Sequence, residues 1–261
     1  MNNASEKNGR AVSLKKAESF GIQYAIYFVF IALILVIAIR EPSFLSLNNF
    51  RNILSMSATR VIFAMGMGAI LITGGVDLSA GRMVGLAAVL SASLLQAADY
   101  SRRMYPGMPV LPLILPILAA MIACGVFGFF NGLFISRLKV PAFIATLGSM
   151  VAVYGATSLY FDRPPYGAQP IGGLDRRFAV LGTGYIGFDG VYSIPYIVII
   201  AALVTVITYI LFNKTTYGKN LYAIGGNAEA ARVSGVNVGR TLIVVYTVAG
   251  LLYGLGGALE A

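Results

Sequence analysis

The sequence predicts an all-α fold, a polytopic bundle of about seven transmembrane helices with one short helix outside the membrane. Hydrophobic residues make up 58% of the chain and charged residues only 11%, and the mean hydropathy is +0.81. A soluble domain carries about 25% charged residues, so this chain cannot cover itself with an ordinary polar surface. The charges also fall between long apolar runs, and a membrane span needs about 20 apolar residues.

Composition also excludes several classes of function. The net charge of +9 is spread over the gaps between apolar runs and forms no patch, which argues against a nucleic-acid partner. The chain has no histidine, and its one cysteine, Cys124, lies inside an apolar run. We therefore expect no disulfide, no metal site, no cofactor and no catalytic residues, and a membrane-embedded enzyme is a poor alternative.

Seven uncharged runs are the predicted helices, because backbone in lipid must satisfy its own hydrogen bonds. They cover residues 19–39, 61–76, 83–98, 104–136, 140–161, 190–213 and 241–259. The polar residues 1–19 lack the pattern of a signal peptide and predict a cytosolic tail, followed by a membrane domain over 20–261. Four prolines predict an irregular entry to the fourth run: Pro106, Pro109, Pro112 and Pro116.

Lysines predict the orientation. With the N-terminus in the cytosol, alternation of the spans brings all six lysines to the cytosolic side: Lys7, Lys15, Lys16, Lys139, Lys214 and Lys219. The last run reaches the final residues without a polar tail, so we expect further spans beyond residue 261.

The second and third runs hold 16 uncharged residues each, about 24 Å of helix against a hydrocarbon core of about 30 Å. Glycines interrupt the joint between them, residues 73–82. Short, interrupted helices are typical of broken helices that line a water-filled path. The alternative is a tight hairpin at the cytosolic surface, with Ser79 as a helix N-cap.

Glycines recur at four-residue spacing in three pairs, Gly81 and Gly85, Gly128 and Gly132, and Gly250 and Gly254. Such pairs let helix backbones approach closely in lipid. They predict either a compact bundle or a contact between subunits.

The loop 213–240 is too polar to cross the membrane and longer than a turn requires. It predicts a short helix over 227–234, with Asn227 as the cap, Glu229 in the first turn and Gly235 as a left-handed stop. This helix either docks a cytosolic partner or lies on the inner leaflet as an amphipathic helix.

The sequence of this loop resembles a known signature. Glu229, Ala230 and Ala231, followed by Gly235, match the E-A-A-x-x-x-G coupling signature of ABC importer permeases, without its I-x-L-P ending. Longer stretches are similar to the ribose/galactose branch of bacterial carbohydrate permeases: YGKN at 217–220, AIGGN at 223–227, GGVDLSAG at 74–81 and PAFIATLG at 141–148. The resemblance runs from about residue 20 to the end and is greatest to permeases for galactose and methyl galactosides.

The resemblance implies a transport subunit in the bacterial inner membrane that imports a monosaccharide, galactose or a methyl galactoside. Its expected partners are a separate ATPase subunit that hydrolyses ATP, a periplasmic sugar-binding protein, and a second permease chain in a homodimer. The residues expected to couple the chain to the ATPase are Gly218, Asn227, Glu229, Ala230, Ala231 and Gly235.

An uncharged sugar needs hydroxyl groups, amides and aromatic faces along its path. The candidates are Asp77, Ser79, Asn131, Thr146, Ser149 and Tyr154. Three of them have a structural alternative at this point: Asp77 can fix the glycine-rich turn or pair with Arg82, and Asn131 and Ser149 can join helices by hydrogen bonds. Two functions remain as alternatives, an ion-coupled secondary sugar transporter with Asp77 as its buried carboxylate, and an ABC permease for ribose or another monosaccharide.

Overall fold

The computed structural model of the chain describes residues 23–163, 167, 169–187 and 193–261. Contacts group the chain into two units, Met1–Asn52 and Ile53–Ala261. In the first unit, the helix Gln23–Arg40 is followed by the 3-10 helix η1 (Pro42–Leu45) and the start of α2 (Leu47–Ile72). The predicted cytosolic tail, residues 1–19, lies outside the described residues.

Helices dominate the described residues, which confirms the predicted all-α class. Six described helices are long and apolar enough to cross a membrane: Gln23–Arg40, α2, α4 (Ile114–Arg137), α5 (Ala142–Phe161), α7 (Tyr196–Lys214) and α10 (Val238–Glu260). The seventh predicted span, α3 (Ala80–Leu94), has only 15 residues. At 1.5 Å per residue it is about 22 Å long, less than the hydrocarbon core.

The predicted run 61–76 was wrong in its extent. Helix α2 starts at Leu47 and continues through Arg51 and Arg60 to Ile72, so its 26 residues are long enough to cross a membrane. The prediction divided this helix because it ended every span at a charged residue. The side chain of Arg60 is exposed, and a long arginine side chain can carry its charge away from the helix that bears it.

The core of the second unit is the contact between α4 and α10, where glycines bring two helix backbones together. A Cβ on Gly128 would lie 2.2 Å from the carbonyl oxygen of Tyr246, and one on Gly250 would lie 2.4 Å from that of Cys124. The glycine pairs at 128/132 and 250/254 therefore serve packing within the chain. The pair at Gly81 and Gly85 does not, since neither position has an atom within 4 Å of an added Cβ.

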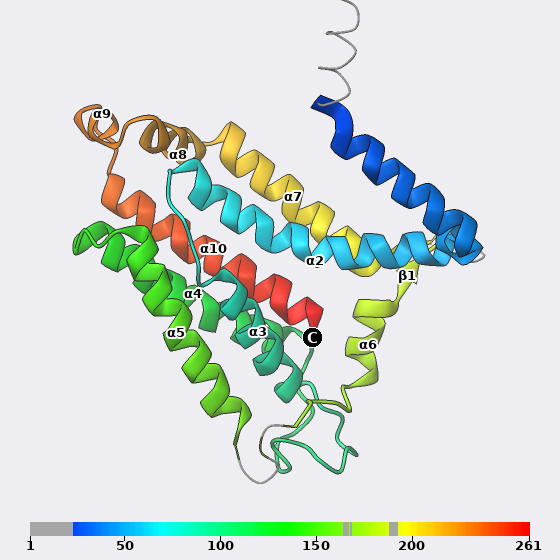
Figure 1. The fold of residues 1–261 in the computed structure, drawn as a ribbon. Helices are drawn as coiled ribbons and strands as arrows, with labels where there is room; N and C mark the ends of the chain where they lie inside the picture. The colour runs from blue at the N-terminus through cyan, green and yellow to red at the C-terminus, as the bar shows by residue number, and fades with distance from the viewer. Residues whose placement is uncertain (1–22, 164–166, 168, 188–192) are drawn as a thin grey trace, which may run out of the picture. The chain divides into compact units, whose positions relative to one another are not determined.

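Between α2 and α3 the chain turns back into the bundle. Gly74, with a φ of +77°, follows the end of α2, and an extended segment then leads to the start of α3 (Figure 1). Asp77 is 4% exposed and Ser79 fully buried. This burial argues against the surface hairpin, which was the alternative interpretation, and agrees with a short, interrupted helix. Ser79 precedes α3 but makes no side-chain cap.

Two opposite ends of the second unit carry the connecting segments (Figure 1). At one end lie the turn between α4 and α5 and the helices α8 (Thr216–Gly226) and α9 (Ala228–Val233). At the other end lie the irregular chain before α4, as the four prolines predicted, and the helix α6 (Arg176–Thr183). The strands β1 (Tyr185–Ile186) and β2 (Ile194–Pro195) pair antiparallel after α6.

Candidate functional site

The returning segment, residues 73–79, is held inside the bundle by polar contacts. One carboxylate oxygen of Asp77, Oδ1, accepts hydrogen bonds from the backbone N–H of Ser79, at 2.9 Å, and from the Ser79 hydroxyl. The hydroxyl of Tyr246, on α10, donates to the carbonyl oxygen of Val76 at 3.1 Å. Asp77 thus fixes the turn before α3, and α10 fixes the segment from the other side.

The second oxygen of Asp77 has a different environment from the first. Oδ2 is buried and has no hydrogen-bond partner in the described part of the chain. The Tyr253 hydroxyl faces the carboxylate, and it contacts the sulfur of Met67 at 3.9 Å. A buried polar atom left without a partner costs free energy, so this oxygen marks a position open to a further donor.

Asn131 connects three elements. Its side-chain amide on α4 donates to the Ser79 hydroxyl at 3.1 Å, and its carbonyl oxygen accepts from the Ser149 hydroxyl on α5. Asn131 is fully buried. Four of the six predicted path residues, Asp77, Ser79, Asn131 and Ser149, therefore form one chain of hydrogen bonds in the interior of the bundle.

The other two predicted path residues lie outside this chain. The hydroxyl of Thr146 donates to the Ala142 carbonyl of its own helix at 2.8 Å. Tyr154 is 54% exposed, and the guanidinium of Arg82 lies over its ring, 4.6 Å from the centroid. The alternative pairing of Arg82 with Asp77 is not formed.

Helix α9 has the caps that its sequence predicted. The Asn227 side chain accepts from the Ala230 N–H at 3.0 Å. At the other end Gly235 has a φ of +86°, and the N–H groups of Gly235 and Val236 donate to the carbonyls of Arg232 and Ala231. These two hydrogen bonds form a Schellman motif. The motif requires a residue that tolerates a positive φ after the helix, and glycine does so without strain.

One face of α9 packs and the other is free for contact. Ala231 is buried in a small apolar cluster with Ile224 and Val238. Glu229 and Arg232 pair at 2.8 Å on the exposed face, and Val233 beside them is 90% exposed. The exposed face of α9 thus offers an ion pair and an aliphatic side chain for contact.

Helix α8 was missed by the sequence prediction, which left residues 216–226 as loop. Its cap was visible, since Thr215 accepts from the Gly218 N–H at 3.3 Å. A Cβ on Gly218 would lie 1.9 Å from the Phe212 carbonyl of α7, and one on Gly225 would lie 1.9 Å from the Ile72 carbonyl of α2. Helix α8 therefore contacts α7 and the end of α2, next to the returning segment.

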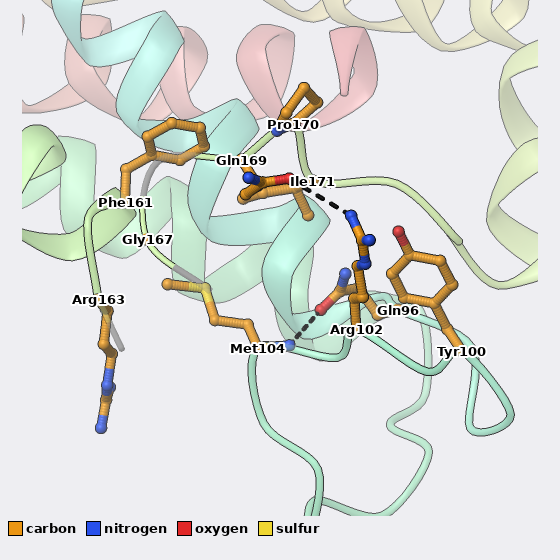
Figure 2. Close-up of a pocket in the computed structure, with 10 residues that line it drawn as sticks. All are labelled: Gln96, Tyr100, Arg102, Met104, Phe161, Arg163, Gly167, Gln169, Pro170 and Ile171. Carbon is orange, nitrogen blue, oxygen red and sulfur yellow. Dashed lines mark hydrogen bonds between the residues drawn. The ribbon is translucent and has the colours of Figure 1, made fainter. Parts of the chain in front are cut away.

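A polar pocket lies at the opposite end, between residues 96–104 and 161–171 (Figure 2). Buried Gln96 holds it together, because its side chain accepts from the Met104 N–H at 2.7 Å and donates to the Gly172 carbonyl at 2.9 Å. Arg102 donates to Gln169 at 3.4 Å across the pocket. The sequence prediction did not single out this pocket, because its residues meet only in the folded chain.

No group of three or more Cys, Asp or Glu residues in the described part of the chain could hold a metal ion. The described part of the second unit has three polar regions: the buried hydrogen-bond chain between helices, the capped helix α9 at one end and the pocket around Gln96 at the other. A polar interior between apolar helices suits a membrane transport component.

Comparison with known sequences agrees with this class. The family described as "Branched-chain amino acid transport system / permease component" matches residues 49–261, and the chain belongs to this family. No solved structure matches the chain.

Curated relatives are more specific. The chain is 47% identical over 251 residues to the galactose/methyl galactoside import permease protein MglC of Haemophilus influenzae, covering 95% of this chain and 74% of the relative. The protein of the same name from Escherichia coli is 46% identical over 90% of this chain and 69% of its own length. The ribose import permease protein RbsC of Bacillus subtilis is 35% identical over 87% of this chain and 64% of its own.

Proposed function

We propose that this chain is the membrane-spanning permease subunit of an ATP-driven importer that carries galactose or a methyl galactoside into the cytoplasm. We infer the substrate from the sequence identity of this chain to two groups of relatives, the galactose/methyl galactoside permeases and the ribose permeases. The chain is 44–47% identical to three galactose/methyl galactoside permeases and 32% identical to a fourth, whereas it is 30–35% identical to ribose permeases. The permease family supports the transport role itself.

The energy for transport comes from a separate ATPase subunit that docks on α9. The support for this docking is the helix itself, which is capped at both ends and presents Glu229, Arg232 and Val233 outward. The coupling residues are those of the resemblance, and the structure suggests their parts. Asn227 and Gly235 cap α9, Ala231 anchors it, Ala230 supplies the capped N–H, and Gly218 allows α8 to approach α7.

Movement of α9 reaches the sugar path through α8. Since Gly225 of α8 lies against the last carbonyl of α2, a shift of α8 acts directly on the returning segment that holds Asp77 and Ser79. We propose that this segment, with its hydrogen bond to Asn131 and through Asn131 to Ser149, has two arrangements. One would hold the path open to the outside of the membrane and the other would hold it open to the cytoplasm. This is a two-state element that an ATPase could bias from the cytosolic side.

The proposed orientation has the N-terminus in the cytosol and the bacterial inner membrane as its location. Lys139, Lys214 and Lys219 lie in the segments at the α8–α9 end of the second unit, which is the expected cytosolic side. The opposite end, with the pocket of Figure 2, then faces a periplasmic sugar-binding protein. A second copy of the chain completes the proposed permease as a homodimer.

Uptake of labelled galactose in cells tests this function. The gene is expressed with its ATPase and binding protein, ATP is depleted while the proton gradient is kept, and unlabelled ribose is the competitor. We expect galactose uptake to fall when ATP is depleted and to be unchanged by unlabelled ribose. Uptake should be lost in Glu229→Lys and less affected in Glu229→Gln. Uptake that persists without ATP would support the ion-coupled alternative with Asp77 as its carboxylate, and strong competition by ribose would support the ribose alternative.

A further inference from the structure

A groove runs between the first part of α3 and the C-terminal part of α5, with a volume of about 220 Å³. Arg82 of α3 and Tyr154, Thr157 and Ser158 of α5 line it. It is distinct from the buried chain of hydrogen bonds, which joins the returning segment to Asn131 of α4 and Ser149 of α5.

Two glycines keep this groove open. Gly81 and Gly85 belong to its lining, and no atom lies within 4 Å of a Cβ added to either. The same spacing at Gly128 and Gly132 brings α4 against α10, with an added Cβ only 2.2 and 2.6 Å from backbone atoms. The α3 pair therefore does not pack helices within this chain and instead leaves bare backbone facing an open space.

Arg82 argues against lipid in this space. It is an exposed arginine near the start of α3, and the neighbouring Met83 carbonyl accepts a hydrogen bond from Cys124, near the middle of α4. No carboxylate lies within ion-pair distance of Arg82 in the described part of the chain, and its guanidinium lies over the Tyr154 ring. Because a charged side chain at this depth is expensive against hydrocarbon, the groove faces water or a polar solute.

The lining has the chemistry that binds an uncharged sugar. The guanidinium of Arg82 offers several N–H donors, and the hydroxyls of Thr157 and Ser158 can both donate and accept. Tyr154 and Phe161 add aromatic rings, which can pack on the apolar C–H face of a sugar ring. Phe161 also lines the pocket of Figure 2, so the groove and that pocket share a wall.

We propose that the α3–α5 groove is a sugar contact site on the transport path, in which Arg82 donates hydrogen bonds to sugar hydroxyls beside the Tyr154 and Phe161 rings. The proposal rests on the proposed function, since it takes the transported solute to be an uncharged monosaccharide. The sugar passes from the pocket of Figure 2 along the wall of Phe161 to Arg82.

Filling the groove tests the proposal. In Gly85→Leu the new side chain enters the open space without a clash at Cβ, whereas the control Gly155→Leu puts the same side chain on α5 at another open position that does not line the groove. We expect Gly85→Leu to lose most uptake of labelled galactose while the amount of assembled complex stays unchanged, and Gly155→Leu to keep wild-type uptake. Arg82→Gln should raise the KM for uptake more than it lowers the maximal rate.

Thiol labelling separates water from lipid in the groove. Cys124 is buried and is the only cysteine of the chain, so Ser158→Cys introduces one accessible thiol. We expect a charged methanethiosulfonate to modify Ser158→Cys and galactose to slow that reaction. Ala156→Cys, exposed on α5 outside the groove, serves as the control whose labelling galactose leaves unchanged.

The outcomes are distinct from those for the function itself. If wild-type protein fails to import galactose with ATP, the proposed function is wrong. If wild-type protein imports galactose and Gly85→Leu imports it equally well, the groove is not a sugar site. The same follows if Ser158→Cys does not react, or reacts at a rate that galactose does not change. In these cases the proposed function is unaffected.

Discussion

At the scale of single residues, Asn131 has the largest structural role in the buried polar chain. It is fully buried and joins Ser79 of the returning segment to Ser149 of α5. Because its amide satisfies one hydroxyl and its carbonyl another, removal leaves buried polar atoms without partners. The interior of the bundle therefore depends on this side chain for the position of the returning segment.

Asn131→Ala should lower the free energy of unfolding by about 1–3 kcal/mol, the cost of leaving buried polar groups unpaired. Thermal unfolding of the purified complex in detergent measures the change. Ser136→Ala on the same helix is the matched control, since its half-buried hydroxyl contacts only the Leu133 carbonyl, at 3.5 Å. Equal stability of the two variants would contradict the role given to Asn131.

Asp175 gives a pH-dependent prediction outside the membrane spans. Hydrogen bonds from the Arg177 guanidinium and backbone N–H lower the pKa of the Asp175 carboxyl below its usual 3.8. This carboxylate also caps α6, accepting from the Arg177 N–H at 2.8 Å. Because the folded pKa is depressed, the stabilisation of α6 is present above pH 3.8 and is lost as the pH falls below it through the folded pKa.

Amide exchange protection over residues 177–180 measures this effect. We expect protection at neutral pH to exceed protection well below pH 3.8 in the wild type, and to be low at both in Asp175→Ala. Protection in the wild type that does not change with pH would show that the carboxylate does not hold the helix.

At the scale of elements, α8 is the link between the contact helix and the returning segment. Gly225 and Gly226 are neighbours in α8 with opposite surroundings. An added Cβ at Gly225 would lie 1.9 Å from the Ile72 carbonyl, and one at Gly226 would meet nothing within 4 Å. The two positions thus form a matched pair for testing the link.

Gly225→Ala should force α8 away from the end of α2, at a cost of about 1–3 kcal/mol for overpacking, and should reduce sugar uptake per ATP hydrolysed. Gly226→Ala should leave both unchanged. The measurement is the ratio of sugar uptake to ATP hydrolysis in the reconstituted complex. A normal ratio in Gly225→Ala would mean that the signal from the ATPase does not pass through this contact.

Elements differ in how well the sequence predicted them. Helices such as α5 and α7 were predicted because their apolar runs are bounded by charges or turns close to the helix ends. Helix α2 was cut at Arg60, because a charge inside a span looks the same in sequence as a charge between spans. Helix α9 was predicted with its caps, since Asn227 and Gly235 are local signals, but α8 depends on contacts with α2 and α7 that are distant in sequence.

The candidate site divides in the same way. Residue types identified Asp77, Ser79, Asn131 and Ser149, and the structure joins them by hydrogen bonds. Sequence could not give the partners, because the bonds join residues 18 and 52 positions apart. The pocket around Gln96 and the groove at Arg82 are also products of folding, since each has residues from two separate helices or loops.

At the scale of the whole molecule, we propose that this chain carries the solute and that a separate partner supplies the energy. Its described residues offer a polar interior and a contact helix at one end, and the permease family to which it belongs transports solutes across membranes. An ATPase acting on α9 would reach the interior through α8 and the end of α2. The central claim is therefore that import by this chain is driven by ATP through a docked partner.

Reconstitution in proteoliposomes tests this claim most directly. The full-length permease is combined with its ATPase and binding protein, and accumulation of labelled galactose is measured with ATP and no ion gradient, then with a proton gradient and no ATP. The account predicts accumulation in the first condition only. Accumulation driven by the gradient without ATP would contradict it.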